Sequence, residues 1–459
     1  MDPISKFLAF FTALALMAGG AGFSEELREL PVLSIDDCVR ASLANNPKLK
    51  EAVSNVDFNR AMAAVAKSAY LPQASTNLGY THYDTSKITL GPGSEALAST
   101  SGFAKRYNVA AESTGVEQLI WDFGKTLNSI KLAKENLTSA QCAFLEAQEN
   151  TVLRAKTAYY DVLKAQLMLE VAREGLRQSQ VHLERAEGFF EVGYRQKYDV
   201  TKAEVAVSNA KLDLVSAEKD YKLAKAALNN VMGNKDSADF AVEEIRGIEF
   251  ADVDADMSLK TAMENRVELL KLQSQARAAQ ADLEVKKKGN WPTVTAGGAH
   301  QVSDTDTDGV GNVKSWNAGV SVNFPWFDGF RTKSQVEAAQ ASLKMAQYAI
   351  EDQALGITLQ VQDAILGLRE AKERFDVSEK LLQQSSENLE IASARYEEGL
   401  GSIIEVTDAE TQLVSAKQSR ASAISGYLSS RAKYDKSVGI ISQSVKDRKS
   451  TRLNSSHRL

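Results

Sequence analysis

The chain contains the same order of motifs twice, and a duplication of this length restricts the possible folds strongly. Asp122 follows a tryptophan, and Asp328 follows a phenylalanine in a similar context 206 residues later. Gly193 and Gly399 are also 206 residues apart, and each interrupts a long proline-free segment. Upstream of Pro72 the spacing between matching positions is 220 residues, so the first copy has 14 additional residues. The chain is therefore expected to build two related structural units.

These two units define the predicted domain organisation. We place the first repeat at residues 23–239, an inter-repeat linker at 240–256, the second repeat at 257–439 and a C-terminal tail at 440–459. Residues at both ends of the chain are not expected to belong to the folded protein, for the reasons given next.

Residues 1–22 are typical of a secretory signal peptide, with Lys6, an apolar run and then small residues. The apolar run is shorter than the about 20 residues that a membrane-spanning helix needs; a buried N-terminal helix is the alternative. Residues 447–459 resemble a translated sequencing adapter and are expected to be a non-native scar.

The placement of proline permits very long helices in both repeats. All seven prolines lie outside residues 93–291 and 326–459, and proline is the residue that most often interrupts a helix. Apolar residues recur at steps of three and four from Ile130 and again from Val336, which is the spacing of a coiled-coil seam. The predicted coiled-coil helices occupy residues 125–232 and 331–438, and each outgoing helix would be about 100 Å long.

Each repeat also contains a predicted β-hairpin, at about residues 73–119 and 293–325. The clearest alternation is in Trp316–Phe324, where one face is apolar and the other is polar. Such a strand is half-buried or faces lipid, and weak alternation in the other strands is normal for membrane barrels. The predicted fold class is therefore mainly α with β, with four strands per chain.

Composition argues against several classes of protein. The net charge of -6 disfavours a nucleic-acid binder, because phosphate neutralisation needs a basic surface. Cys38 and Cys142 cannot form a disulfide framework or a four-sulfur metal site, and Cys142 is expected to be a small packing residue. The histidines are scattered, and no HExxH, Walker, GxSxG or CxxC pattern occurs. Residues 304–309 begin like a calcium loop, but Ser315 stands where a glutamate is required. We therefore expect no catalytic residue, no cofactor and no metal site.

Four strands are too few to seal a membrane barrel, since the smallest closed barrels have about eight. Unpaired strand edges in hydrocarbon cost several kcal/mol per group, so the chain must oligomerise if its hairpins enter a bilayer. Aromatic residues fall where helix meets strand, which is the level of a membrane-interface belt; a core cluster at a helix–sheet junction is the alternative. These residues are Tyr70, Trp121, Trp291, Trp326 and Phe327.

With these features the chain resembles the TolC-type outer-membrane efflux and secretion ducts of Gram-negative bacteria. The resemblance covers about residues 32–439, and it rests on the Asn-Asn-Pro segment at 45–47, the junctions at Trp121 and Phe327, and the Gly-x5-Asp/Glu-Val-Thr tips. It implies a homotrimer whose twelve strands form one outer-membrane β-barrel, with a coiled-coil α-barrel that extends into the periplasm. It also implies a passive exit duct for an efflux pump or a type I secretion system. The implied partners are a periplasmic adaptor (membrane fusion) protein, an inner-membrane pump of the RND, ABC or MFS type, and outer-membrane lipid.

The resemblance further implies roles for residues at the tips of the coils. Glu405 and Asp408 match a ring that constricts the periplasmic mouth, although a solvated helix N-terminus would also favour acidic residues. Asp199 and Tyr396 match residues that tie neighbouring coils in the closed mouth. The expected surface for adaptor docking consists of Gly193, Tyr194, Gly399 and Leu400.

One position departs from the pattern of the family. Gly401 stands where the best-known member has an arginine. Arg195 or Lys197 is expected to take its place by pairing with Glu397 or Glu398, because the duplicated loops carry opposite charges.

A soluble periplasmic coiled-coil adaptor or structural protein is the alternative from another class. Extraction separates the two: a channel needs detergent and forms a heat-sensitive oligomer, whereas an adaptor dissolves in buffer.

Overall fold

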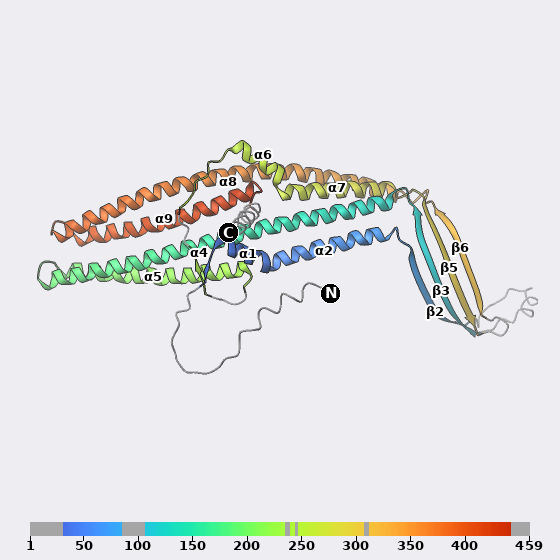
Figure 1. Cartoon of the computed structure of the whole chain (residues 1–459), viewed down its shortest axis with the longest axis horizontal. Helices are drawn as coiled ribbons and strands as arrows, with labels where there is room; N and C mark the ends of the chain where they lie inside the picture. Colours follow the sequence, from blue (N-terminus) through green and yellow to red (C-terminus); the bar gives the residue numbers. More distant parts are fainter. Residues whose placement is uncertain (1–30, 85–105, 235–238, 244–246, 307–311, 442–459) are drawn as a thin grey trace, which may run out of the picture.

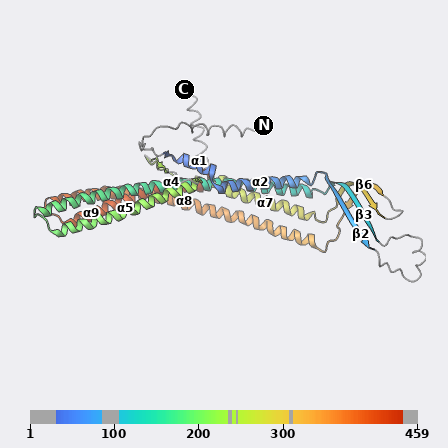
Figure 2. The same cartoon turned by 90° about the horizontal axis from the view of Figure 1, so that it is seen from below.

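The structure, a computed structural model, describes residues 31–84, 106–234, 239–243, 247–306 and 312–441. The expected signal peptide and the expected scar lie outside these residues. The molecule is elongated: paired helices run along its long axis, and a four-stranded sheet stands at one end (Figures 1 and 2). Within the described ranges, no helix combines the length and the apolar character that crossing a membrane requires.

Both repeats build the same order of elements, as the duplication predicts. The first repeat consists of β1 (Val32–Leu33), α1 (Ile35–Asn45), α2 (Pro47–Ser68), β2 (Gln73–Asp84), β3 (Arg106–Trp121), α4 (Lys125–Glu191) and α5 (Lys197–Met232). The second consists of β4 (Ala241–Val242), α6 (Ala255–Asn265), α7 (Val267–Lys287), β5 (Thr293–Thr305), β6 (Val313–Asn323), α8 (Arg331–Glu397) and α9 (Ile403–Ser437). The parallel pairing of β1 with β4 was not predicted, because two-residue strands leave no periodic signal.

The two hairpins join edge to edge into one antiparallel sheet with the order β2-β3-β5-β6. The pairing of β3 with β5 places Val109 opposite Thr305 and Trp121 opposite Val294, so the sheet is shared between the repeats. β2 and β6 are the outer strands, and among the residues that the structure describes one edge of each has no paired strand. The helices end at the sheet and do not cover it (Figures 1 and 2).

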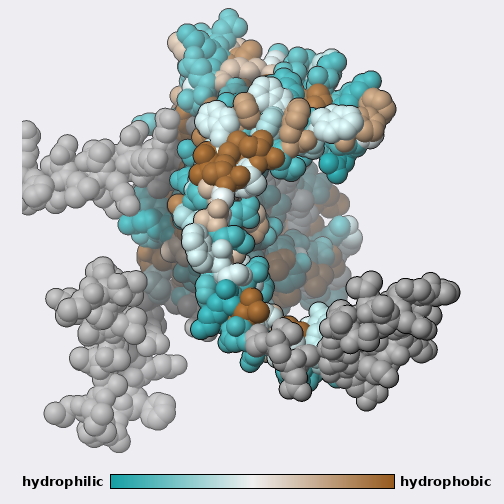
Figure 3. Space-filling view, turned by 90° about the vertical axis from the view of Figure 1, so that its right-hand side faces the viewer, coloured by the Kyte–Doolittle hydropathy of each residue, from teal (hydrophilic) through white to brown (hydrophobic). Residues whose placement is uncertain are grey.

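The strand predicted at Trp316–Phe324 is expected to be half-buried or to face lipid. In the single chain it is not half-buried. Every residue of β6 is exposed, and Trp316 has 78% of its surface accessible. Figure 3 views this end of the molecule and shows a patch of hydrophobic side chains bordered by hydrophilic ones. An apolar strand face that the chain does not bury needs another apolar environment, such as lipid.

The duplicated aspartates, Asp122 and Asp328, bind the N-terminal ends of the two long helices, α4 and α8. Asp122 accepts hydrogen bonds from the backbone N–H of Gly124 (3.0 Å) and of Thr126 (2.6 Å). Asp328 accepts from the backbone N–H of Thr332 (2.9 Å) and from its hydroxyl (2.6 Å). The first amides of a helix have no partner within the helix, and a negative charge there is favourable. This role explains why aspartate recurs at the same place in both repeats.

Replacing Asp122 by alanine is expected to lower the free energy of unfolding by about 1–2 kcal/mol, because the cap and its charge are both lost. Asparagine should cost less, since its side-chain oxygen still accepts a hydrogen bond. Asp352→Ala is the control, because this aspartate is exposed in the interior of α8. Thermal unfolding followed by circular dichroism measures the difference, and equal midpoints for the two alanine variants would contradict the capping role.

Each repeat has its own hydrophobic core where the short helices pack against the middle of the long ones. In the first, Cys38 packs with Tyr159 and Leu228. In the second, Ile357 packs with Tyr427. The Tyr427 hydroxyl donates to the carbonyl of Glu249 (3.2 Å) and accepts from the N–H of Ala251 (3.0 Å), so this core also fixes the segment that precedes α6.

A buried charged cluster joins the two repeats midway along α4. Arg266 donates to Glu268 (2.9 and 3.2 Å), to Gln360 (2.8 Å) and to the carbonyl of Ser437 (3.1 Å). Glu149 is only 4% exposed, and its Oε2 has no hydrogen-bond partner among the residues that the structure describes. Burial and, to a lesser extent, the neighbouring Glu268 together raise the pKa of Glu149 to about 7, against the opposing effect of Arg266. This carboxyl is therefore protonated at moderately acidic pH.

Candidate functional site

The ends of the two helical hairpins farthest from the sheet have matching turns. The backbone N–H of Tyr194 donates to the carbonyl of Phe189, and that of Leu400 donates to the carbonyl of Arg395, each at 2.9 Å. Gly193 and Gly399 have φ of 77° and 80°, the left-handed region in which glycine is favoured. The glycines that interrupt the long proline-free segments thus directly follow the C-cap residues of α4 and α8, Val192 and Glu398, and let the chain turn there.

The two turns contact each other directly. A Cβ atom at Gly399 would lie 2.5 Å from the Tyr194 hydroxyl oxygen, so the tyrosine ring occupies the space beside the second turn. Ala392, Ile403 and Val406 form a small hydrophobic cluster beneath this contact. The predicted docking residues therefore lie at one end of the molecule (Figure 1), and both turns contribute to that surface.

Three residues named from the sequence form one contact between the turns. The Tyr396 hydroxyl donates to Asp199 Oδ2 (3.3 Å), which joins the end of α8 to the start of α5. Arg195 donates to the carbonyls of Tyr396 (2.8 Å) and Gly401 (3.2 Å), and its guanidinium lies 4.5 Å from the centre of the Tyr396 ring. We call Arg195, Asp199 and Tyr396 the tip clamp. Burial, together with Asp199, raises the pKa of Tyr396 to about 12, so its hydroxyl remains a donor at physiological pH.

The predicted pairing of Arg195 with Glu397 or Glu398 is wrong. Arg195 binds backbone carbonyls, and Glu397 instead pairs with Arg185 of α4 at 2.5 Å. Sequence reasoning chose partners by opposite charge, whereas the turn at Gly399 leaves carbonyl groups free to accept. Arg195 nevertheless donates a hydrogen bond to the carbonyl of Gly401, the position at which this chain departs from the pattern of the family.

Glu405 and Asp408 are both exposed on the first turns of α9. Residues three apart share one face of a helix, so the two carboxylates form an acidic stripe. Arg395 Nε lies 3.6 Å from Glu405 Oε2. Both side chains are exposed, so this ion pair contributes little to the position of Glu405. The N-cap hydroxyl of Ser402 accepts from the Glu405 N–H (3.4 Å).

Sequence reasoning missed a second polar contact between the coils. His182 Nε2 on α4 lies 3.0 Å from Glu410 Oε1 on α9, and both side chains are largely buried. In the sequence His182 is one of four scattered histidines. Nothing near it indicates its partner Glu410, which is 228 residues away. Cys142 is buried, as a packing residue would be.

Four of the five predicted aromatic residues at the strand–helix junctions are exposed, namely Trp121, Trp291, Trp326 and Phe327, whereas Tyr70 is half-buried. Phe123 contacts Trp121 and Trp291, with ring centres 6.0 and 5.2 Å apart. Phe327 lies 6.2 Å from Trp326, which is 80% exposed. The alternative of a plain core cluster therefore does not describe these residues in the single chain.

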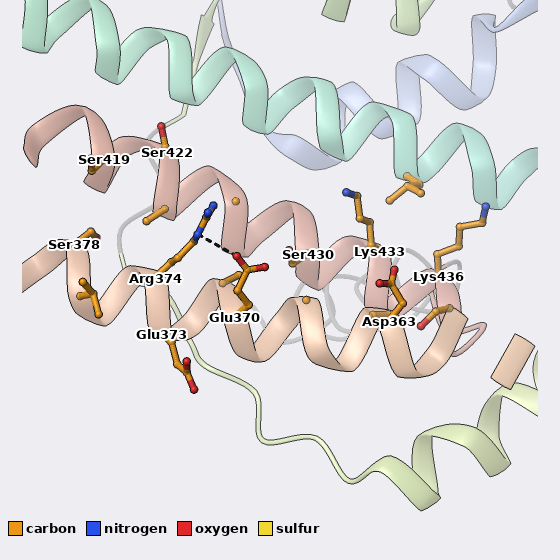
Figure 4. A pocket seen from close by; sticks show the side chains of 18 of the residues that line it. Asp363, Glu370, Glu373, Arg374, Ser378, Ser419, Ser422, Ser430, Lys433 and Lys436 are labelled. Atoms are coloured by element: carbon orange, nitrogen blue, oxygen red, sulfur yellow. Dashed lines mark ion pairs between the residues drawn. The ribbon is translucent and has the colours of Figure 1, made fainter. Parts of the chain in front are cut away.

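A groove of about 1200 Å³ lies between α8 and α9. Figure 4 shows Glu370 and Arg374 paired along α8 (3.1 Å), and Lys436 extends from α9 to Asn150 of α4 (2.5 Å). Serine and charged side chains make up more than half of the residues that line this groove. Among the described residues, the lining contains neither histidine nor cysteine. Within the described ranges, no three histidine, cysteine, aspartate or glutamate residues gather as metal ligands would.

Comparison with known proteins identifies the family of this chain. The chain matches the family described as "Outer membrane efflux protein" over residues 38–234 and 258–439. It is 22% identical to Outer membrane protein TolC of Escherichia coli (strain K12) over 454 residues, which are 96% of this chain and 87% of that protein. It is 23% identical to Nodulation protein T of Rhizobium leguminosarum bv. viciae over 399 residues, which are 85% of this chain and 79% of that protein.

Solved structures show the same fold. The Campylobacter jejuni CmeC outer membrane channel superposes with a TM-score of 0.77 at 16% identity, covering 94% of this chain and 97% of that one. CusC superposes with a TM-score of 0.76 at 16% identity, covering 92% and 95%. Of the two classes considered, channel and soluble adaptor, these matches support the channel. The chain belongs to the outer membrane efflux protein family, and it is a subunit of an outer-membrane exit duct for efflux or secretion.

Proposed function

We propose that three copies of this chain assemble into one duct, with their sheets closed into a barrel in the outer membrane and their helices extended into the periplasm. The observation that carries this proposal is the open sheet, in which β2 and β6 have exposed side chains and, within the described ranges, one unpaired edge each. Three copies supply twelve strands, which exceeds the about eight of the smallest closed barrels. Closure pairs every edge, as a membrane requires.

The exposed tips support a second part of the proposal, docking of a periplasmic adaptor that connects the duct to an inner-membrane pump. Tyr194 and Leu400 are both large, apolar and exposed at the end farthest from the sheet. Exposed apolar residues in one place are typical of a protein interaction site. The tip clamp lies between these residues, so an adaptor that binds there can change the contact between the coils.

The duct is tested by extraction and conductance. The full-length protein should require detergent for extraction, run as a heat-sensitive oligomer on gels, and conduct ions in planar lipid bilayers. A monomer that dissolves in buffer and conducts no ions would overturn the proposal.

We further propose that Glu405 and Asp408 face the axis at the periplasmic mouth, so three copies would provide six carboxylates. A ring of acidic side chains attracts cations and repels anions. Glu405→Gln combined with Asp408→Asn is therefore expected to move the cation-to-anion permeability ratio of the channel toward one. Reversal potentials under a salt gradient measure this ratio.

The matched control is Glu387→Gln combined with Glu390→Gln, an exposed acidic pair with the same spacing on α8. This control should leave the permeability ratio unchanged. Equal shifts in the two double variants would show that general surface charge, rather than a ring at the mouth, sets selectivity.

A further inference from the structure

The segments that connect helices to strands carry an excess of basic residues. They are residues 66–73, 121–128, 285–293 and 323–334, and they contain seven basic and two acidic residues, although the whole chain has a net charge of -6. The two acids, Asp122 and Asp328, are engaged with helix amides as described above. We call the basic residues the junction basic cluster: Lys67, Lys125, Lys286, Lys287, Lys288, Arg331 and Lys333.

The structure brings this cluster together at one level of the molecule. The C-terminal ends of α2 and α7 and the N-terminal ends of α4 and α8 all lie next to the sheet (Figure 1). Lys288 Nζ lies 3.4 Å from where a Cβ at Gly124 would stand, which places the end of α7 against the start of α4. A Cβ at Gly289 would lie 2.6 Å from Thr332 Oγ1, so the end of α7 also touches the start of α8. The lysines after α7 therefore connect the basic residues at the starts of α4 and α8.

The stability of the helices explains only part of these charges: Lys67, Lys286 and Lys287 lie in the last turns of α2 and α7, where the helix dipole favours cations. Lys125, Arg331 and Lys333 lie in the first turns of α4 and α8, where the helix dipole disfavours cations. The ion pairs that the cluster makes are mostly long and exposed, such as Arg331 with Asp328 (3.7 Å) and Lys333 with Glu337 (4.0 Å). Across the described part of the chain, Lys67, Lys125 and Lys288 make no ion pair. An external anion would compensate this charge.

The neighbouring aromatic residues indicate which anion lies within reach. Trp121, Trp291 and Trp326 are exposed in the same connecting segments. Exposed tryptophans at strand ends mark the depth of the lipid headgroups. Long basic side chains at that depth extend along the protein so that their charges reach the headgroups. The phosphate of a phospholipid therefore lies at the height of the cluster.

We propose that the junction basic cluster binds anionic phospholipid headgroups, of the phosphatidylglycerol type, in the leaflet on the helical side of the outer membrane. This inference rests on the proposed seating of the duct, with the sheet in the membrane and the helices in the periplasm. Several phosphates held around the base of the barrel fix its depth. They also neutralise repulsion between the basic residues of neighbouring copies.

Tryptophan quenching by brominated lipid tests the proposal. The Trp316→Phe variant of the full-length protein retains tryptophans only in the connecting segments, because Trp316 is the one that lies within β6. It is reconstituted into phosphatidylcholine vesicles that contain the same fraction of either brominated phosphatidylglycerol or brominated phosphatidylcholine. The quenching curves should give a preference for phosphatidylglycerol of about fivefold or more, the contribution of one basic residue near a charged membrane surface. Because the attraction is electrostatic, high salt should reduce it.

Charge variants locate the binding surface. K125Q/K288Q/R331Q/K333Q should reduce the preference toward one, whereas K125R/K288R/K333R should keep it. The matched control, K211Q/K219Q/K222Q/K380Q, removes four exposed charges from the coil and should also keep it. If the quadruple junction variant does not assemble, K125Q/K288Q provides the same comparison, and its preference should fall below that of the coil control.

Several outcomes would overturn the proposal. Equal quenching by the two brominated lipids would show that the aromatic residues touch lipid without headgroup selection. A preference that survives K125Q/K288Q/R331Q/K333Q, or K125Q/K288Q in its place, would place the selective site elsewhere. Loss of the preference on addition of inorganic phosphate at matched ionic strength would identify the free anion as the ligand. Conductance is measured in the same preparations, so failure of the duct itself is distinguished from failure of lipid selection.

Discussion

Replacing Glu149 by glutamine is expected to raise the free energy of unfolding by about 3 kcal/mol at pH 8. The pKa of this carboxyl is raised from 4.5 to about 7 by burial in the cluster that joins the repeats. Below pH 4.5 the carboxyl is protonated in both the folded and the unfolded state, so it has no pH-dependent effect. Between pH 4.5 and 7 the unfolded state loses its proton first, so stability falls as the pH rises. Glutamine resembles the protonated carboxyl and removes this loss.

Thermal unfolding in detergent at pH 4 and pH 8 measures the effect. The Glu149→Gln variant should have nearly the wild-type midpoint at pH 4 and a higher midpoint at pH 8. Glu146→Gln, one turn earlier on α4, is the control, because it removes an ion pair with Lys271 (2.5 Å) and should give no gain at pH 8. A Glu149→Gln variant that is less stable than wild type at pH 8 would show that the ionised carboxylate is stabilising.

Replacing Arg195 by alanine is expected to raise the conductance of the closed channel about tenfold or more. The substitution removes two charge-assisted hydrogen bonds, to the carbonyls of Tyr396 and Gly401, and a cation–π contact with the Tyr396 ring. Hydrogen bonds to charged groups contribute about 1.5–3 kcal/mol each, so the loss favours separation of the tips in every copy. Tyr396→Phe should have a smaller effect, because it removes only the 3.3 Å hydrogen bond to Asp199. Single-channel recording in planar bilayers measures both effects.

Arg185→Ala is the matched control, since it also removes one arginine at the same end of α4. Arg185 pairs with Glu397, and both side chains are about half exposed; such pairs contribute about 0–1 kcal/mol. Arg195→Lys should restore the closed state only in part, because lysine lacks the planar fork that binds two carbonyls. Equal leakage through the Arg195→Ala and Arg185→Ala channels would contradict the role of the tip clamp.

The positions of the elements follow closely from local sequence. The proline-free segments gave long helices, and the glycines at 193 and 399 ended them, because backbone conformation at these residues depends on their own chemistry. The alternation in Trp316–Phe324 predicted a strand, and β6 is present there. Its exposure could not be predicted, since alternation alone does not distinguish a half-buried strand from one that faces lipid.

The candidate site could be predicted only in part. The resemblance placed Asp199 and Tyr396 at the tips, the charges of the duplicated loops suggested Arg195 or Lys197, and the structure brings Asp199, Tyr396 and Arg195 together. The sequence did not identify the partners of Arg195. It also gave no sign of the contact between His182 and Glu410, or of the buried Glu149, whose Oε2 has no hydrogen-bond partner among the described residues. Each of these depends on residues from different repeats, and charge in a sequence does not specify which opposite charge will be nearest.

The sequence by itself determined the duplication, the order and length of the helices and strands, and the turns between them, because prolines, glycines and apolar periodicity act on neighbouring residues. The tertiary structure alone decided which helices lie side by side and which charged groups are buried. It also decided that the sheet, in the part of the chain that the structure describes, keeps one unpaired edge on each outer strand. Those outcomes depend on how segments about 200 residues apart pack together. Dehydration of a charge such as Glu149 arises only after that packing has formed.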